Sequence, residues 1–239
     1  MTVRYGVFGG AFDPPHNGHL SVAREAVAQL SLDRLLLVVA AQSPLKPPSS
    51  ATPDQRLEMA RRLAQLVPRA DACGIELRQD GPSYTIDTMK ALRARLQADE
   101  WWLIIGADQF VDFARWRSPD ALLRRANLAV FPRPGYEIDV RAVIRNIEQV
   151  AGICYDTTND GQEWNLQRRD DHDATTRIRV LHMTPVSLSS TEIRATLAAG
   201  KSIDGLVPET IANWIRAQHL YAPSAPADHD CQPVHQRKT

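Results

Sequence analysis

The first forty residues place a strand, a glycine- and proline-rich loop, a helix and a second strand in direct succession. Residues 3–8 form a short apolar run, and a loop containing Gly-Gly and Pro-Pro follows at 9–16. Apolar residues then recur at helical spacing between 20 and 30, before a second apolar run at 34–39. Because two parallel strands need a crossover connection, this order predicts a βαβ unit and a parallel sheet.

The same alternation continues along most of the chain. Further strands are expected at 73–77, 101–105, 127–131 and 178–182. Further helices are expected from the capping box at 52–55 through Val67, and at 86–96, 137–150, 190–199 and 208–219. We therefore predict one α/β domain over residues 1–221, a doubly wound parallel sheet with C-terminal helices. A polar surface insertion is expected at 156–176 and a disordered tail at 222–239.

Composition narrows the functional class. The chain has 239 residues, of which 44% are hydrophobic, and its 28 Lys and Arg residues balance its 28 Asp and Glu residues. This balance argues against binding nucleic acid or an anionic membrane through bulk charge. The longest apolar run, Leu35–Ala41, is too short to span a membrane, and the first residues lack the pattern of a secretory signal. The three cysteines are far apart and indicate no disulfide framework, so we expect a cytoplasmic protein, whose oligomeric state, a homo-oligomer included, stays open.

The loop after the first strand carries the densest chemistry. Residues 9–19 read Gly-Gly-Ala-Phe-Asp-Pro-Pro-His-Asn-Gly-His, where an open parallel sheet binds its ligand. The two leading glycines are expected to let a ligand approach the backbone and to adopt positive φ. Asn17 is expected to cap the following helix, so that free amides and the positive end of the helix dipole face an anion. His16 and His19 can then reach the same anion, which suits a polyphosphate whose charge grows in the transition state. Two surface histidines on a capped turn are the structural alternative; the flanking glycines, strand and helix favour the functional one.

A second candidate anion site lies near the end of the chain. Ser189 and Glu192 form a capping box, so the amides of Ser190 and Thr191 are expected to point outward at a helix start. Arg194 follows one turn later and can hold phosphate as a fork. Alone, this is an ordinary capped helix with a surface arginine. As the partner of the first motif, it predicts a second anion-binding helix end at the carboxyl edge of the sheet.

Together these motifs resemble the nucleotidyltransferase superfamily with an H-x-G-H signature and a late S-S-T-x-I-R motif. Further segments resemble one member family, the bacterial nicotinate mononucleotide adenylyltransferases. Those segments are Tyr84–Thr88, Ile105–Asp108 followed by Trp116, Phe131–Tyr136 and Leu206–Glu209. The resemblance covers about residues 3–221 and implies a Rossmann-like fold.

The resemblance implies transfer of AMP from ATP to nicotinate mononucleotide, giving deamido-NAD and pyrophosphate in NAD biosynthesis. The mononucleotide phosphate would attack the α-phosphorus in line, without a covalent enzyme intermediate, which mainly needs positioning and charge neutralisation. The partners implied are these two small molecules, with no nucleic acid or membrane. Mg²⁺ is the implied cofactor, held mainly by the substrate phosphates rather than by a protein site.

The same resemblance assigns residues to roles. Catalytic roles fall to His16, His19 and Arg194. ATP-binding roles fall to Phe8, Gly9, Gly10, Gly106, Asp108, Arg133, Ser190 and Thr191. Roles in binding nicotinate mononucleotide fall to Lys46, Tyr84, Thr85 and Trp116.

Within this set, Asp108 would bind the ribose hydroxyls and Arg133 would lie near the adenine. The helix start at Tyr84 and Thr85 would offer amides to the nicotinate carboxylate, and Trp116 would stack on the pyridine ring. The structural alternatives are a helix cap for Asp108, a helix-start aromatic for Tyr84 and a packing residue for Trp116.

Two features depart from the family pattern. The loop at 43–46 reads Ser-Pro-Leu-Lys where Pro-Pro-His-Lys or Pro-Pro-His-Arg is usual, which leaves Lys46 as the expected contact to the acceptor phosphate. The insertion and the tail are longer than usual, and the tail residues His229, Cys231 and His235 match no metal-site spacing.

The alternatives to this reaction are a sister phosphopantetheine adenylyltransferase or cytidylyltransferase, a class I aminoacyl-tRNA synthetase and a non-catalytic nucleotide sensor. The sisters lack the combination of Tyr84-Thr85, Ala107-Asp108 and Trp116, and a synthetase would need a longer chain. A sensor would not need both histidines and Arg194.

Overall fold

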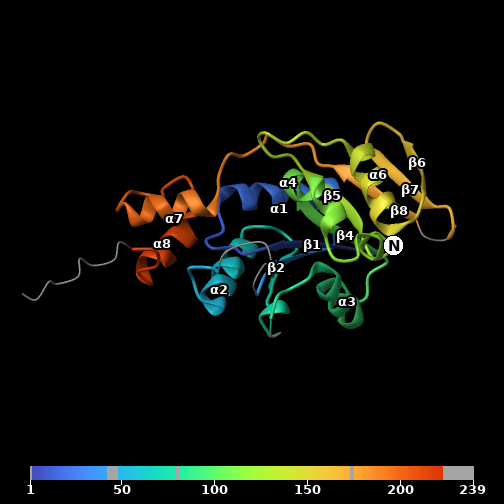
Figure 1. Cartoon of the computed structure of the whole chain (residues 1–239). Helices are drawn as coiled ribbons and strands as arrows, with labels where there is room; N and C mark the ends of the chain where they lie inside the picture. The colour runs from blue at the N-terminus through green and yellow to red at the C-terminus, as the bar shows by residue number, and fades with distance from the viewer. Residues whose placement is uncertain (1, 42–47, 79–80, 173–174, 223–239) are drawn as a thin grey trace, which may run out of the picture.

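The computed structural model describes residues 2–41, 48–78, 81–172 and 175–222 (Figure 1). At its centre is an eight-stranded sheet in the order β3-β2-β1-β4-β5-β8-β7-β6. The strands are β1 (Arg4–Gly10), β2 (Arg34–Val39), β3 (Ala70–Cys73), β4 (Glu100–Gly106), β5 (Asn127–Phe131), β6 (Tyr155–Asn159), β7 (Glu163–Arg168) and β8 (Thr175–Val180). All neighbouring pairs are parallel except β6 with β7 and β7 with β8. The chain builds outward from β1 through β2 to β3, then returns to place β4 on the other side of β1, so the order reverses between β1 and β4.

Helices cover both faces of this sheet. They are α1 (Asn17–Gln29), α2 (Pro53–Ala64), α3 (Thr85–Arg95), α4 (Ala107–Val111), α5 (Pro119–Leu123), α6 (Val140–Ala151), α7 (Ser190–Ala198) and α8 (Glu209–Ala217), with short 3₁₀ turns at Glu76–Arg78 and Phe113–Arg115. Successive strand residues face opposite layers. On β1, Val7 packs with α3 to α6, whereas its neighbour Phe8 packs with α1, α2, α7 and α8. The predicted doubly wound α/β fold with C-terminal helices is therefore confirmed.

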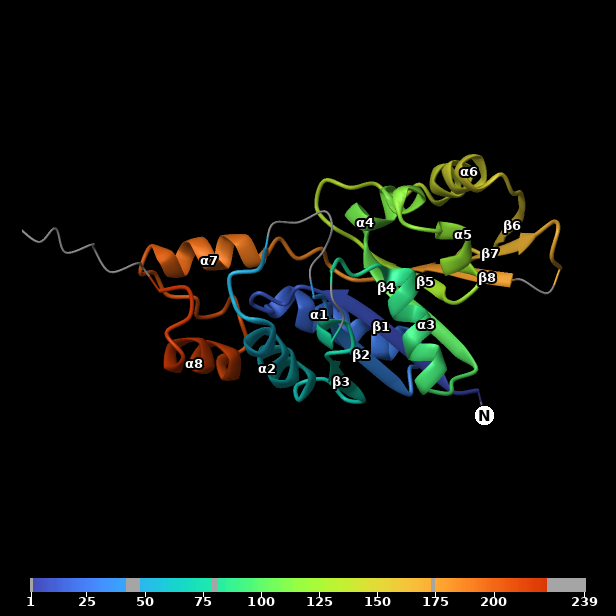
Figure 2. The same ribbon diagram turned by 60° about the horizontal axis from the view of Figure 1, so that its bottom comes forward.

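The C-terminal helices are attached to the start of α1. Figure 2 shows α7 and α8 together at one end of the molecule, with α8 beside α2. The backbone amide of Asn17 donates to the carbonyl of Leu206 at 3.0 Å, and its side-chain amide donates to the carbonyl of Gly205 at 2.8 Å. These bonds hold the chain that links α7 to α8 against the first turn of α1.

The segment expected as a polar surface insertion is largely part of the sheet. Residues 155–168 form the hairpin β6–β7, and its turn at Asn159–Gly161 has a positive φ of 91° at the glycine. The turn motif Asn-Asp-Gly is the signal that could have identified the hairpin. The strand predicted at 73–77 is wrong in position: β3 ends at Cys73, and a 3₁₀ turn follows. The short helices α4 and α5 were not predicted.

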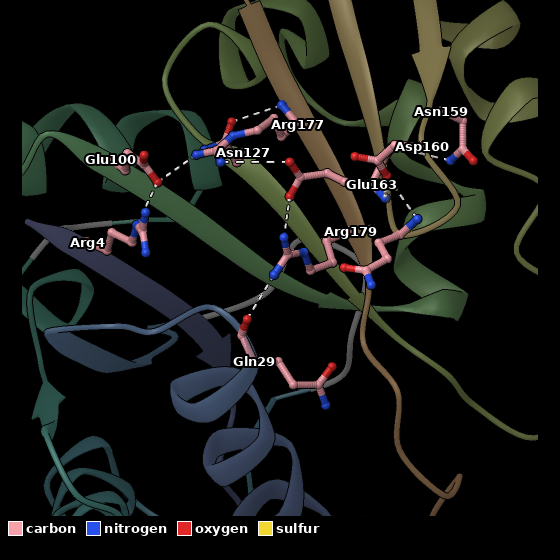
Figure 3. Close-up of polar contacts among 10 residues, drawn as sticks. Arg4, Gln29, Glu100, Asn127, Asn159, Asp160, Glu163, Arg177 and Arg179 are labelled. Carbon is pink, nitrogen blue, oxygen red and sulfur yellow. Dashed lines mark hydrogen bonds and ion pairs between the residues drawn. The ribbon is translucent and has the colours of Figure 1, made fainter. Parts of the chain in front are cut away.

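Charge pairing explains how the polar segment at β7 is accommodated in the sheet. Glu163 of β7 is 7% exposed and lies 3.0 Å from Arg179 and 3.8 Å from Arg177, both on β8 (Figure 3). Arg177 also donates to Glu100 of β4 at 2.6 Å. Charged residues can face each other across neighbouring strands, so a polar composition here is compatible with a strand.

The expected tail beyond Ala222 lies outside the described residues, as do the tail residues His229, Cys231 and His235. Within the part of the chain that is described, no helix has the length and apolar character needed to cross a membrane.

Candidate active site

The candidate site lies where β1, β4 and β5 end, beside the point at which the strand order reverses. An open sheet binds its ligands in this crevice, because the loops on either side diverge there. A small cleft opens at this place. It is lined by Phe8, His16, Gly18, His19, Val22, Phe131, Pro132, Arg133, Met183, Val186 and Leu188.

The two histidines form a close pair at the start of α1. His16, not Asn17, is the cap of the helix, with an extended backbone (φ −140°, ψ 175°). Its backbone N–H donates to Nδ1 of His19 at 3.2 Å, and the two ring centroids are 3.9 Å apart. A neutral His19 therefore carries its proton on Nε2. The predicted cap at Asn17 is wrong because the Asn17 side chain bonds Gly205 instead.

Burial sets the charge of His16. The residue is only 5% exposed, and the Nδ1 atom of its ring has no hydrogen-bond partner among the described residues. Burial, with the positive charge of Arg133 second, lowers the pKa of His16 to about 4. His16 is thus neutral at pH 7, and its residue lines the cleft. Gly18 makes room for this ring, since a Cβ there would come within 3.0 Å of two ring atoms.

The two glycines lie at the end of β1 rather than in a turn. Neither Gly9 nor Gly10 has positive φ, so that expectation is wrong; Phe12 takes the left-handed conformation instead, at φ 50°. A Cβ on Gly9 would meet nothing within 4 Å, which leaves open space beside the backbone. A Cβ on Gly10 would press on the Phe12 ring at 3.3 Å. The buried ring of Phe8 packs edge-on against Phe12 and forms part of the cleft wall.

The structure brings the second motif onto the first. The hydroxyl of Ser190 donates to the carbonyl of Pro14 at 2.9 Å, across 176 residues of sequence. Arg194 donates from Nη1 to the carbonyl of Asp13 at 2.6 Å and from Nη2 to the hydroxyl of Thr191 at 3.3 Å. The start of α7, with its predicted capping box confirmed, therefore lies against the loop before α1. Both helix starts present positive ends at the same edge of the sheet.

A third contribution comes from the ends of β4 and β5. Asp108, in the first turn of α4, forms an ion pair with Arg133 at 3.3 Å between Oδ1 and Nε. Gly106 caps α4, and a Cβ there would collide with the Asp108 carboxylate and lie 3.1 Å from Nε of Arg133. The Arg133 guanidinium also stacks over the ring of Phe131, at 5.6 Å from its centroid. Phe131 and Arg133 line the cleft, and Gly106 and Asp108 lie beside Arg133.

The expected acceptor residues lie near one another on the α3 side of the sheet. Tyr84 caps α3, and Thr85 is its first residue. Trp116 is half-buried against Phe113, with ring centroids 5.2 Å apart. Arg117 links the two elements, because its guanidinium stacks over the Tyr84 ring at 4.7 Å. Sequence reasoning missed Arg117, which only its position after Trp116 could have suggested.

Neither the predicted role of Lys46 nor a protein metal site is supported by the geometry of the described residues. Lys46 lies outside the described residues, so its predicted role stays a prediction. Among the residues that are described, no group of three or more His, Cys, Asp or Glu side chains could hold a metal ion. Sequence reasoning gave no role to the buried residues Asp13 and Arg56 or to the half-buried Tyr221, because their contacts are to residues distant in sequence.

Comparison with known proteins gives consistent results. The family model described as cytidylyltransferase-like matches residues 7–196. A probable nicotinate-nucleotide adenylyltransferase of Chromobacterium violaceum is 37% identical over 228 residues, covering 92% of this chain and 100% of the relative. A protein of the same description from Pseudomonas aeruginosa is 35% identical over 222 residues, covering 92% of this chain and 98% of the relative.

Solved structures support the fold alone. A nicotinic acid mononucleotide adenylyltransferase of Plasmodium falciparum, complexed with APC, matches with a TM-score of 0.62 at 15% identity, over 92% of this chain and 97% of that one. A Vibrio parahaemolyticus structure described as a putative nicotinate-nucleotide adenylyltransferase matches with a TM-score of 0.55 at 17% identity, over 93% and 97%.

Proposed function

Because the chain belongs to the cytidylyltransferase-like family, and to its nicotinate-nucleotide adenylyltransferases, we propose that it transfers AMP from ATP to nicotinate mononucleotide. The products are deamido-NAD and pyrophosphate, in a step of NAD biosynthesis. The observation that carries the assignment of residues is the meeting of two helix starts: Ser190 and Arg194 bond the Asp13–Pro14 segment, beside the histidine pair. We assign the nucleotidyltransferase domain to residues 1–221.

The reaction is an in-line displacement at the α-phosphorus of ATP. An oxygen of the mononucleotide phosphate forms the new bond to phosphorus, and the bond to the bridging oxygen of the β-phosphate breaks. The electron pair leaves with pyrophosphate, so no proton transfer to or from the protein is required. Catalysis then depends on positioning and on stabilising charge that moves onto the leaving group.

The histidines and Arg194 supply that stabilisation in our proposal. The ring of His16 lines the cleft, and in its neutral form one ring nitrogen carries a proton that can be donated to a phosphate oxygen. Arg194 uses two of its five N–H donors on Asp13 and Thr191, and no hydrogen bond to another described residue uses the rest. Its remaining donors suit the β- and γ-phosphates, together with the free amides at Ser190.

In our proposal the nucleoside binds beside Asp108 and Arg133, and the acceptor binds near the start of α3. We assign the ribose hydroxyls to Asp108 and the adenine side to Arg133, whose mutual ion pair is half-exposed and open to exchange for a ligand. We assign the nicotinate carboxylate to the amides at the start of α3, near Tyr84 and Thr85, and the pyridine ring to Trp116. We assign Phe8, Gly9 and Gly10, at the end of β1, to the surface against which the nucleotide lies. We assign Lys46 to the acceptor phosphate.

Mg²⁺ enters this proposal through ATP. Bound to the phosphates, the ion would neutralise charge on the leaving pyrophosphate. Among the described residues no group of three or more His, Cys, Asp or Glu side chains could hold the ion, and we assign its ligands mainly to the substrate phosphates. The proposal keeps the expectation of a cytoplasmic enzyme with small-molecule partners, and neither nucleic acid nor a membrane is part of it.

The test is pyrophosphate release from ATP and Mg²⁺ with three acceptors in parallel: nicotinate mononucleotide, nicotinamide mononucleotide and phosphopantetheine. We expect rapid release with the first and much slower release with the other two. Turnover with phosphopantetheine alone would overturn the assignments of Tyr84 and Trp116 while keeping the phosphate site. ATP binding without release from any acceptor would favour a nucleotide sensor.

A further inference from the structure

One buried carboxylate joins four separate parts of the chain beneath the phosphate site. Asp13 is 3% exposed and accepts three hydrogen bonds through its side chain. Its Oδ2 accepts from the amide of Ser50 at 2.7 Å, and its Oδ1 accepts from the amide of Ala51 at 3.1 Å and from the hydroxyl of Tyr221 at 2.6 Å. Arg194 completes the group, with Nη1 at 3.8 Å from Oδ2. The carboxylate therefore connects the loop after β1, the residues before α2, helix α7 and the residues after α8.

The charges around Asp13 are arranged so that Arg194 is left available. A buried carboxylate is costly unless it is paired. Arg56 is 1% exposed, and its charge attracts Asp13, while its Nη1 donates to the carbonyls of Ala11 and Ala40 at 3.0 and 2.6 Å. Two positive charges thus act on one carboxylate, and of these two arginines Arg194, whose side chain is 27% exposed, is the one that can also reach a ligand.

Tyr221 follows α8, and both its side chain and its backbone conformation are held by the folded structure. The residue lies beyond the segment 7–196 that the family model matches, and it packs against the same core layer as Phe8. Its backbone is left-handed at φ 58°, as is that of His219 at φ 50°. Such residues are strained unless their surroundings hold them. Burial and the bond to Asp13 raise the pKa of the Tyr221 hydroxyl, which keeps it protonated as a donor.

We propose that Asp13 and Tyr221 are positioning residues for the phosphate-binding Arg194. The Tyr221 hydroxyl fixes the Asp13 carboxylate, and Asp13 in turn fixes Arg194 through its main-chain carbonyl and its charge. Neither residue touches substrate. The inference rests on the proposed adenylyl transfer for its kinetic readout, and it makes the segment after α8 part of the assembly of the active site.

The main test is Tyr221→Phe in the full chain, which removes only the hydroxyl. Losing a hydrogen bond to a charged group predicts a rise of about 5- to 30-fold in the KM for ATP, with a smaller loss in kcat. The KM for nicotinate mononucleotide should change less than about twofold, because the residues assigned to its carboxylate and its pyridine ring lie at the start of α3 and at Trp116. A purely structural role would instead lower the folded fraction and leave both KM values unchanged.

Asp13→Asn tests the same unit from the other partner. A side-chain amide has one accepting oxygen, so at least one of the three donors from Ser50, Ala51 and Tyr221 would face another donor. If Tyr221 acts through Asp13, the double variant will match Asp13→Asn within about twofold, because the effects of coupled residues do not add. If Asp13→Asn does not fold, the KM for ATP of Tyr221→Phe alone tests the proposal.

Tyr155→Phe is the matched control. This tyrosine is buried at the far edge of the sheet, in β6, and its hydroxyl has no hydrogen-bond partner among the described residues. Wild-type kinetics are expected from it. ATP affinity, measured by calorimetry with Mg²⁺, gives a readout that does not need turnover. Wild-type turnover with unchanged ATP affinity and KM in Tyr221→Phe overturns this inference, whereas absence of turnover in the wild type overturns the proposed function.

Discussion

The burial of His16 predicts a specific loss of stability in mild acid. Its pKa is about 4 in the folded protein, against an ordinary value of 6.5. Between these two values the unfolded chain binds a proton that the folded chain excludes, so the free energy of unfolding falls as the pH falls. The loss begins near pH 6.5 and is complete below pH 4. At 1.36 kcal/mol per pH unit, it amounts to about 3 kcal/mol in full and about 2 kcal/mol between pH 7 and pH 5.

The measurement is urea unfolding of the wild type and of His16→Gln at pH 7, 6 and 5. Glutamine is polar and does not titrate, so other acid-sensitive groups contribute equally to both proteins and cancel in the comparison. The wild type should lose about 2 kcal/mol more than the variant between pH 7 and pH 5. His172→Gln, which removes an exposed imidazole at the other end of the sheet, controls for the loss of one histidine.

If the free energy of unfolding fell equally with pH in the wild type and in His16→Gln, this reasoning would be refuted. His16 would then have the same pKa in the folded and unfolded states. A ligand adds a second check. If ATP phosphates lie beside His16, their charge favours the imidazolium, and saturating ATP with Mg²⁺ should reduce the acid loss by more in the wild type than in the variant.

Three further predictions concern catalysis. His19→Ala should lower kcat by roughly 10²-fold, because it removes a donor from the leaving phosphates; steady-state kinetics with kcat unchanged would exclude His19 from the mechanism. Trp116→Ala should raise the KM for nicotinate mononucleotide more than the KM for ATP, whereas equal changes, or lost circular dichroism, would indicate a packing role. Gly106→Ala should weaken ATP binding by about tenfold, since the added methyl displaces the Asp108–Arg133 pair, and calorimetry that shows unchanged affinity would contradict the ribose assignment.

Local signals in the sequence predicted most of the helix starts correctly. The capping boxes at Thr52 and Ser189 are both present, with Gln55 and Glu192 as the returning side chains. Such boxes involve residues three apart, so the sequence contains the whole interaction. The continuous apolar runs likewise predicted buried parallel strands, because strands covered on both faces need apolar residues on both.

The errors arose where long-range contacts decided the local structure. Asn17 has the usual residue type for a helix cap, yet its side chain bonds Gly205 and the cap falls to His16. The segment that contains β7 was predicted as a polar surface insertion because composition cannot show that Glu163 is paired with Arg179 on the neighbouring strand. In each case the residue that determines the local structure is distant in sequence, and its position in the fold could not be predicted from the sequence.

The same limit explains why the candidate site was found while its support was not. His16, His19 and Arg194 are recognisable because their residue types suit phosphate, whatever surrounds them. Asp13 belongs to the same motif, but its partners lie 37, 38 and 208 residues away, and its function depends entirely on where those partners fall. A motif therefore identifies the groups that can bind a transition state, and the fold determines whether they are held where binding is productive. If Tyr221 acts as we propose, residues outside the matched family segment will affect the ATP kinetics of this chain as directly as residues within it.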